Sequence, residues 1–228
     1  MDQLDQTSQN YSLTAAGQRN KVLRNTMWLL ALSLLPTIAG AWVGMATGIT
    51  AGLRGFVGFA VFIVGLLAFQ AAIFKFRNSS TGVFILMAFT FFMGLMLSRL
   101  LGYVMGMSNG TTLVMNAFAS TAGVFAVMAT LATVIKRDLS GMGKWLFAGM
   151  IAIVIAAAIN LFFGSSLMML ALTALSTILF SFYMLYDLKN IIDGGETNYI
   201  VAATHLYIDI FAVFQNLLAI FGIFGGDD

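Results

Sequence analysis

Long apolar runs separated by short polar segments dominate the chain of 228 residues. Runs such as 84–96 and 151–159 carry no charge and show no alternation of polar and apolar positions. A helix needs about 20 apolar residues to cross a bilayer, and backbone amides in hydrocarbon must be hydrogen-bonded within the protein. The pattern therefore predicts an all-α integral membrane protein with seven transmembrane helices. We expect the apolar spans at 27–46, 54–74, 81–103, 112–135, 145–163, 167–187 and 199–224.

The composition agrees with this class, because 60% of the residues are hydrophobic and only 9% are charged. A soluble domain carries about 25% charged residues. The chain has no cysteine and one histidine, so disulfides and thiolate nucleophiles are excluded and a transition-metal site is not expected. Seven spans leave no room for a soluble catalytic domain. We therefore expect no enzymatic activity, no resident cofactor and no nucleic-acid partner.

Three segments follow from the polar residues at the two ends. Residues 1–26 are polar and predict a flexible cytoplasmic tail, 27–224 form the transmembrane domain, and 225–228 form a short C-terminal tail. The apolar run after the first segment starts too late and is too long for a signal peptide.

The basic residues predict the orientation. With seven spans, nine of the eleven lysines and arginines lie on the face that carries the N-terminus, and only Arg54 and Arg99 lie on the other. Basic residues are enriched in cytoplasmic loops. We expect a multi-pass protein of the bacterial inner membrane with a cytoplasmic N-terminus and a periplasmic C-terminus. The last span carries Asp209, Gln215 and Asn216, so a re-entrant hairpin is the alternative to a full crossing there.

Two acids lie within the last two spans. A carboxylate at membrane depth costs about 2.5–3.5 kcal/mol and is a functional hypothesis by default. Asp187 ends the sixth span, where the alternative is an interfacial acid that reaches water. Asp209 lies ten residues into the seventh span, at a depth of about 15 Å with about 1.5 Å per residue. Its alternative is a buried, hydrogen-bonded acid without a role.

The short connection 193–198 makes the last two spans antiparallel neighbours in this prediction. Facing carboxylates would repel each other, and one shared proton would remove the repulsion. Asp187 and Asp209 are therefore predicted to form a pH-sensitive latch. The pair also offers oxygen ligands of the kind that bind Ca²⁺, so Ca²⁺ is the candidate metal at these two residues.

Three further residues are candidates for tuning the pair. His205 lies four residues before Asp209 and hence on the same helical face. It is predicted either to tune the carboxyl group or to serve as a structural hydrogen-bond donor. Lys75 and Arg77 end the second span on the same side as Asp187 and are candidate counter-ions. Their alternative is the ordinary positive charge of a cytoplasmic loop.

The chain resembles the Bax inhibitor-1 family, also called the transmembrane Bax inhibitor motif family, over nearly its whole length from Lys21 onward. The most specific runs are Tyr186-Asp187, Leu206-Tyr207-Ile208-Asp209-Ile210 and Gln215-Asn216-Leu217-Leu218. Within the family it is similar to proteobacterial modulators of the FtsH protease, through Arg137-Asp138-Leu139-Ser140 and Asn190-Ile191-Ile192-Asp193-Gly194-Gly195-Glu196-Thr197-Asn198-Tyr199-Ile200.

The resemblance implies a seven-helix bundle with one central helix, in which Asp187 and Asp209 form a pH sensor associated with a calcium leak. It implies that a basic residue ending the second helix, here Lys75 or Arg77, pairs with the sensor. Some members carry a further acid in that helix, whereas the second span here has only Gln70 as a polar residue. The similar subgroup implies a membrane-embedded partner, the FtsH protease complex, whose action the chain would modulate. A pH-gated calcium or cation leak is the alternative function.

Paired aspartates also occur in intramembrane aspartyl proteases, in which two carboxyl groups share a proton. The Gly-x-Gly-Asp run expected before the second aspartate is absent here, because Leu206-Tyr207-Ile208 precedes Asp209. The enzymatic interpretation is therefore disfavoured.

Overall fold

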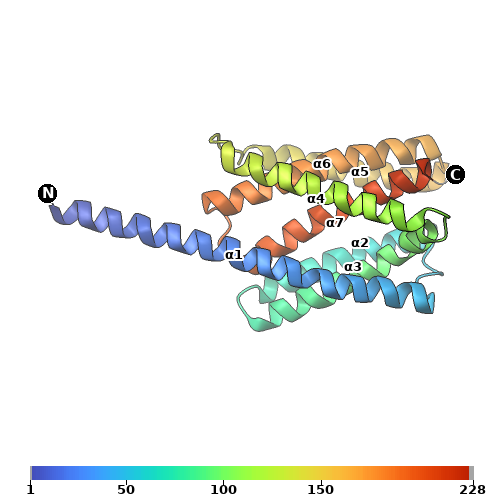
Figure 1. Cartoon of the computed structure of the whole chain (residues 1–228), viewed down its shortest axis with the longest axis horizontal. Helices are drawn as coiled ribbons and strands as arrows, with labels where there is room; N and C mark the ends of the chain where they lie inside the picture. The colour runs from blue at the N-terminus through green and yellow to red at the C-terminus, as the bar shows by residue number, and fades with distance from the viewer. Residues whose placement is uncertain (1, 226–228) are drawn as a thin grey trace.

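The structure, a computed structural model, describes the backbone of residues 2–225 and the side chains of residues 17–225. Within this range the chain folds into seven helices, in agreement with the prediction (Figure 1). All seven are long and apolar enough to cross a membrane. Their bounds are α1 Asp2–Thr47, α2 Gly55–Phe76, α3 Ser80–Met105, α4 Gly110–Val134, α5 Met142–Phe163, α6 Ser166–Asp193 and α7 Tyr199–Phe224.

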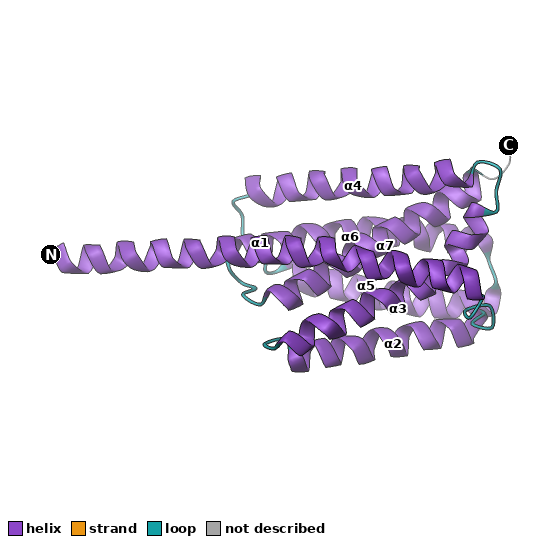
Figure 2. Cartoon of the chain, turned by 60° about the horizontal axis from the view of Figure 1, so that its bottom comes forward, coloured by secondary structure: helices purple, strands orange, loops and turns teal. Residues whose placement is uncertain are grey.

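Helix α7 lies at the centre of the bundle. It packs against α1, α2, α3, α4 and α6, whereas the outer helix α5 packs only against α6 and α2 (Figure 2). Residues such as Leu206 and Val213 are accordingly fully buried. Helix α7 is also continuous over 26 residues, or about 39 Å at about 1.5 Å per residue, which exceeds the hydrocarbon core of about 30 Å. The predicted central helix is confirmed, and the seventh span forms one helix rather than a re-entrant hairpin.

Helices α1 and α3 approach each other closely through small residues. A Cβ atom built on Gly40 or on Gly94 would overlap the backbone of the opposite helix, and one built on Gly44 would overlap the Ser98 side chain. Small residues let two transmembrane backbones approach in this way. Gly40 and Gly44, four residues apart in the first span, therefore serve helix packing.

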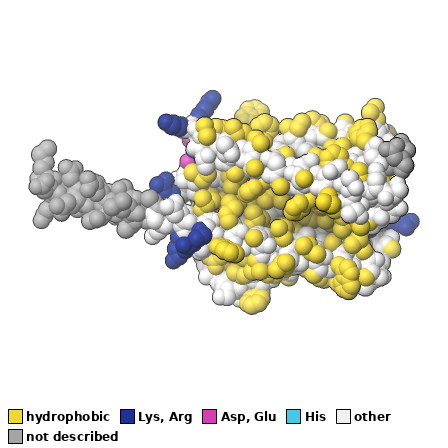
Figure 3. Space-filling view, in the orientation of Figure 1, with side chains coloured by type: hydrophobic (Ala, Val, Ile, Leu, Met, Phe, Trp, Pro, Cys, Tyr) yellow, Lys and Arg dark blue, Asp and Glu magenta, His cyan; other side chains and the backbone are white. Residues whose placement is uncertain are grey.

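The outside of the bundle is apolar along its length and basic at one end. Large side chains on the outer surface, such as Trp28, Trp145 and Phe162, are 73%, 80% and 80% exposed, as expected for contact with lipid. Figure 3 shows apolar side chains along the flanks, and most lysine and arginine side chains at the end where α1 leaves the bundle.

The backbone is helical through most of the segment that was predicted as a flexible tail, and its flexibility stays a prediction. Helix α1 begins at Asp2 and continues without interruption into the first span. Near the bundle, Val22 and Leu23 pack against the hydrophobic core, and Thr26 is fully buried. The core contacts of the first span therefore start several residues before the predicted boundary at 26/27. The side chains before Gly17 and most of the 225–228 tail lie outside the described residues.

Candidate functional site

The short connection between α6 and α7 sets these helices side by side. Helix α6 ends at Asp193 and is capped by Gly194, whose φ of +84° is in the left-handed region that favours glycine. Helix α7 begins after Asn198, whose Oδ1 accepts hydrogen bonds from the N–H groups of Ile200 and Val201 at 3.0 and 3.2 Å. The Asn198 side chain also donates to the carbonyl oxygen of Arg77 at 2.9 Å. The start of α7 is thus capped and tied to the α2–α3 turn.

The two acids predicted from the sequence meet between these helices. The carboxyl groups of Asp187 on α6 and Asp209 on α7 are in hydrogen-bonding contact with each other. Asp209 is only 3% exposed, and Asp187 is half-buried. Among the described residues, Oδ2 of Asp209 has no hydrogen-bond donor. A proton held between the two carboxyl groups would supply that missing donor.

Tyr183 is a member of the site that the sequence analysis missed. It lies one turn before Asp187 on α6, and its hydroxyl is within electrostatic range of both carboxyl groups. The spacing of four residues, which places two side chains on one helical face, was the available signal. Glu196, in the connection to α7, lies within electrostatic range of Asp187 as well.

His205 interacts with Asp187 rather than with Asp209. Its side chain is exposed, it acts electrostatically on Asp187, and no hydrogen bond joins it to Asp209 in the described part of the chain. Four residues turn a helix about 40° beyond a full turn. Because α7 is central, this offset turns His205 away from the buried position of Asp209. A tuning role of His205 stays a prediction, and in this structure it would act on Asp187.

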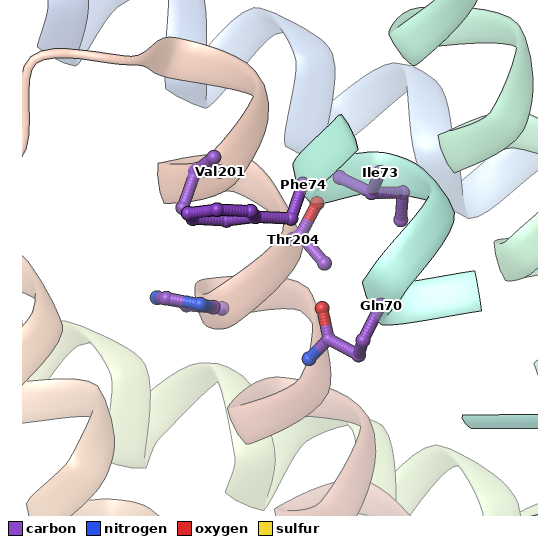
Figure 4. A pocket seen from close by; sticks show the side chains of 6 residues that line it. Gln70, Ile73, Phe74, Val201 and Thr204 are labelled. Carbon is purple, nitrogen blue, oxygen red and sulfur yellow. The ribbon is translucent and has the colours of Figure 1, made fainter. Parts of the chain in front are cut away.

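His205 also lines a cavity of about 270 Å³ between α2 and α7. Figure 4 shows Gln70 and Phe74 of α2 facing Thr204 and Val201 of α7 across this space. Gln70, the polar residue of the second span, therefore lines this cavity together with His205.

Lys75 and Arg77 contact aromatic rings instead of the acids. The Lys75 ammonium lies 5.6 Å from the centroid of the Phe76 ring, and the Arg77 guanidinium lies 4.2 Å from that of Phe74. Across the described side chains, the one ion pair within 4.0 Å joins Lys189 to Asp193 at 2.8 Å. The predicted counter-ion to Asp187 is therefore not formed in this structure.

A metal site at the pair would need ligands beyond the two aspartates. Among the described residues, no group of three or more His, Cys, Asp or Glu side chains is placed to hold a metal ion. Ca²⁺ takes six to eight oxygen ligands, and Asp187 and Asp209 supply at most four. Backbone carbonyls or water would have to complete such a site, and the role of the pair as Ca²⁺ ligands stays a prediction.

Polar contacts deeper in the bundle hold α7 at a fixed rotation. The Tyr207 hydroxyl lies 2.8 Å from Thr37 Oγ1 on α1 and 3.4 Å from the carbonyl oxygen of Thr90 on α3. Further along, the Asn216 amide donates to Ser176 Oγ on α6 at 2.9 Å. These bonds turn α7 so that Asp209 faces α6.

These features define a seven-helix membrane protein with a buried pair of carboxyl groups on its last two helices. Residues 19–226 match the family described as "Inhibitor of apoptosis-promoting Bax1". The chain belongs to the Bax inhibitor-1 family.

Bacterial relatives cover almost the whole chain. An uncharacterized membrane protein of Vibrio cholerae is 36% identical over 95% of this chain and 96% of its own length. A Campylobacter jejuni protein is 38% identical over 93% of each chain. The modulator of FtsH protease YccA of Escherichia coli K12 is 31% identical over 96% of this chain and 98% of its own length.

Proposed function

We propose that this protein binds the membrane-embedded FtsH protease and modulates its action, and that Asp187 and Asp209 act as a pH-sensitive latch in that role. The observation that carries the proposal is the full-length similarity to the Escherichia coli protein named as a modulator of that protease. The chain offers its partner a helical membrane surface and the long helix α1, which projects from the bundle (Figure 1).

The proposal includes a location in the bacterial inner membrane, with a cytoplasmic N-terminus and a periplasmic C-terminus. The bacterial relatives and the seven candidate spans support it. The gathering of basic side chains at the end where α1 leaves the bundle supports the orientation (Figure 3).

The contact between the two carboxyl groups supports the latch. Two full charges about 4 Å apart repel by about 4 kcal/mol at an effective dielectric constant of about 20. One shared proton removes this repulsion and holds α6 to α7 through a hydrogen bond. Loss of that proton would push the helices apart and change the surface offered to the protease. Asp209 has little access to water, so α6 and α7 must separate to relieve the repulsion.

The test is co-purification with the protease from membranes, together with the lifetime of one of its membrane substrates. An excess of this protein is expected to retain the protease and to slow degradation of the substrate. Asp209→Asn, which keeps the shape of the side chain and removes the charge, is expected to abolish the pH dependence of this effect. Asp138→Asn removes an acid in the α4–α5 loop, outside the pair, and is expected to preserve that dependence. Failure to retain the protease, with no change in substrate lifetime, would refute the proposal.

A second candidate function is a pH-gated leak for Ca²⁺ or other cations. The cavity between α2 and α7 favours it, because His205 lines this cavity and also interacts with Asp187. Purified protein in liposomes loaded with a Ca²⁺ indicator should then pass Ca²⁺ with a pH dependence that Asp209→Asn abolishes. A flux that is unchanged in this variant would refute the mechanism.

A further inference from the structure

A second cavity lies at the opposite end of the bundle from the α6–α7 connection. It has a volume of about 480 Å³ and forms where α2 begins and α3 ends. Phe59 and Phe62 of α2 and Met96 and Leu100 of α3 form its apolar walls. The volume falls within the range of about 300–1,000 Å³ that is typical of small-molecule sites.

Arg99 of α3 supplies the positive charge of this cavity. One guanidinium N–H group donates to the carbonyl oxygen of Leu53. Arginine has five N–H donors, and no acidic partner lies within 4.0 Å of Arg99 among the described residues. No aspartate or glutamate lines the cavity, whereas Gln215 of α7 and Tyr103 add polar groups to it. The cavity thus combines a cation that lacks an anion with apolar walls.

The depth of Arg99 matches the polar boundary of a membrane. It lies six residues before the end of α3, which is about 9 Å at about 1.5 Å per residue. A long basic side chain at this depth reaches the level of the lipid head groups while its stem stays in apolar surroundings. Tyr103, one turn further on, is 66% exposed and marks the outer edge of the cavity.

We propose that this cavity binds an anionic phospholipid, with the phosphate at Arg99 and an acyl chain along the apolar walls between α2 and α3. A guanidinium group can bind two phosphate oxygens at once, which fixes the head group in one orientation. The lipid is anionic because the cavity offers no carboxylate to neutralise the ammonium group of a zwitterionic lipid. This site is separate from the pair of aspartates and is independent of the proposed function.

The test is lipid binding to the full-length protein in detergent, measured by native mass spectrometry with phosphatidylglycerol and with phosphatidylethanolamine. Phosphatidylglycerol is expected to bind at least several-fold more tightly. Arg99→Gln is expected to remove that preference, and Arg99→Lys, which keeps the charge, to retain part of it. Arg54→Gln is the matched control, because Arg54 is a basic residue at the same end that does not line the cavity. This variant is expected to bind like the wild type.

A further variant separates the charge from the shape of the site. Leu100→Trp places bulk in the cavity without changing charge and is expected to weaken binding of both lipids. Equal affinity for the two lipids would overturn the proposal, as would equal losses of lipid affinity in Arg99→Gln and Arg54→Gln.

Glycerol 3-phosphate is added as a competitor to test whether the acyl chain is needed for binding. If it displaces the lipid at equal concentration, the site binds free phosphate esters and the proposal fails.

Discussion

The contact between α1 and α3 gives a prediction whose size follows from the structure. In Gly94→Ala, the new methyl group would overlap the carbonyl oxygen of Thr37 and lie 2.9 Å from the amide nitrogen of Ala41. Both atoms belong to the backbone of α1, so no side chain can rotate away to make room. The two helices must therefore move apart.

The expected cost comes from this overlap. Non-bonded heavy atoms prefer a separation of about 3.5 Å, so the helices must separate by at least about 0.6 Å at the Ala41 nitrogen and by more at the Thr37 oxygen. Overpacking of this kind costs about 1–3 kcal/mol, which is a change of about 5- to 150-fold in the folding equilibrium constant. Because both obstructing atoms are backbone, we expect Gly94→Ala in the upper half of this range.

The assay is reversible unfolding in mixed detergent micelles, followed by tryptophan fluorescence. Gly123→Ala on α4 is the control, because a Cβ atom built there meets nothing within 4 Å. It should be neutral, or more stable by up to about 1 kcal/mol through helix propensity. If Gly94→Ala stays within about 0.5 kcal/mol of the wild type, the range of neutral surface changes, the close packing of α1 on α3 is refuted.

Two further variants test the surroundings of the site, and a third tests the loop between α4 and α5. Tyr207→Phe removes the hydroxyl that bonds Thr37 and should cost about 1 kcal/mol in the same assay; no loss would show that this bond does not stabilise the bundle. Asn198→Ala removes the cap of α7 and its hydrogen bond to the α2–α3 turn. This variant should lower the free energy of unfolding by about 2 kcal/mol. Hydrogen exchange in the first turn of α7 should then be faster, and unchanged exchange would contradict the cap. Hydrogen bonds from the Ser140 N–H and hydroxyl groups lower the pKa of Asp138. These bonds therefore stabilise the folded protein at pH values above the ordinary pKa of an aspartate, and this stabilisation is lost as the pH falls through the lowered pKa. Ser140→Ala should raise this pKa toward its ordinary value in an NMR titration, and an unchanged pKa would be inconsistent with the hydroxyl bond.

The sequence predicted the helices and the meeting of the two acids for simple physical reasons. The length of each apolar run fixes a span, and the short connection 194–198 makes α6 and α7 antiparallel neighbours. Asp187 and Asp209 are therefore brought to the same region without any detailed geometry.

The surroundings of the acids could not be predicted in the same way. The direction of His205 depends on how a central helix is rotated, and distant contacts such as that of Tyr207 with Thr37 set this rotation. Lys75 and Arg77 lie at the end of α2, but their charged groups lie over the rings of Phe76 and Phe74 and not beside the acids. The apolar pattern predicted where the first membrane span begins, but it could not predict that helix α1 begins earlier, at Asp2, because polar residues form helices as well.

The central claim is that Asp187 and Asp209 share one proton, and infrared spectroscopy of the carboxyl C=O stretch tests it most directly. The account predicts the band of one protonated carboxyl group per chain at neutral pH, which disappears on alkaline titration. The band should be absent when both residues are replaced in Asp187→Asn/Asp209→Asn and unchanged in Glu196→Gln, and its frequency should shift in Asp187→Asn, because the carboxyl group that shares the proton with the buried Asp209 is then replaced. A wild-type protein with no such band, or a band whose frequency is the same in Asp187→Asn as in the wild type, would contradict the shared proton.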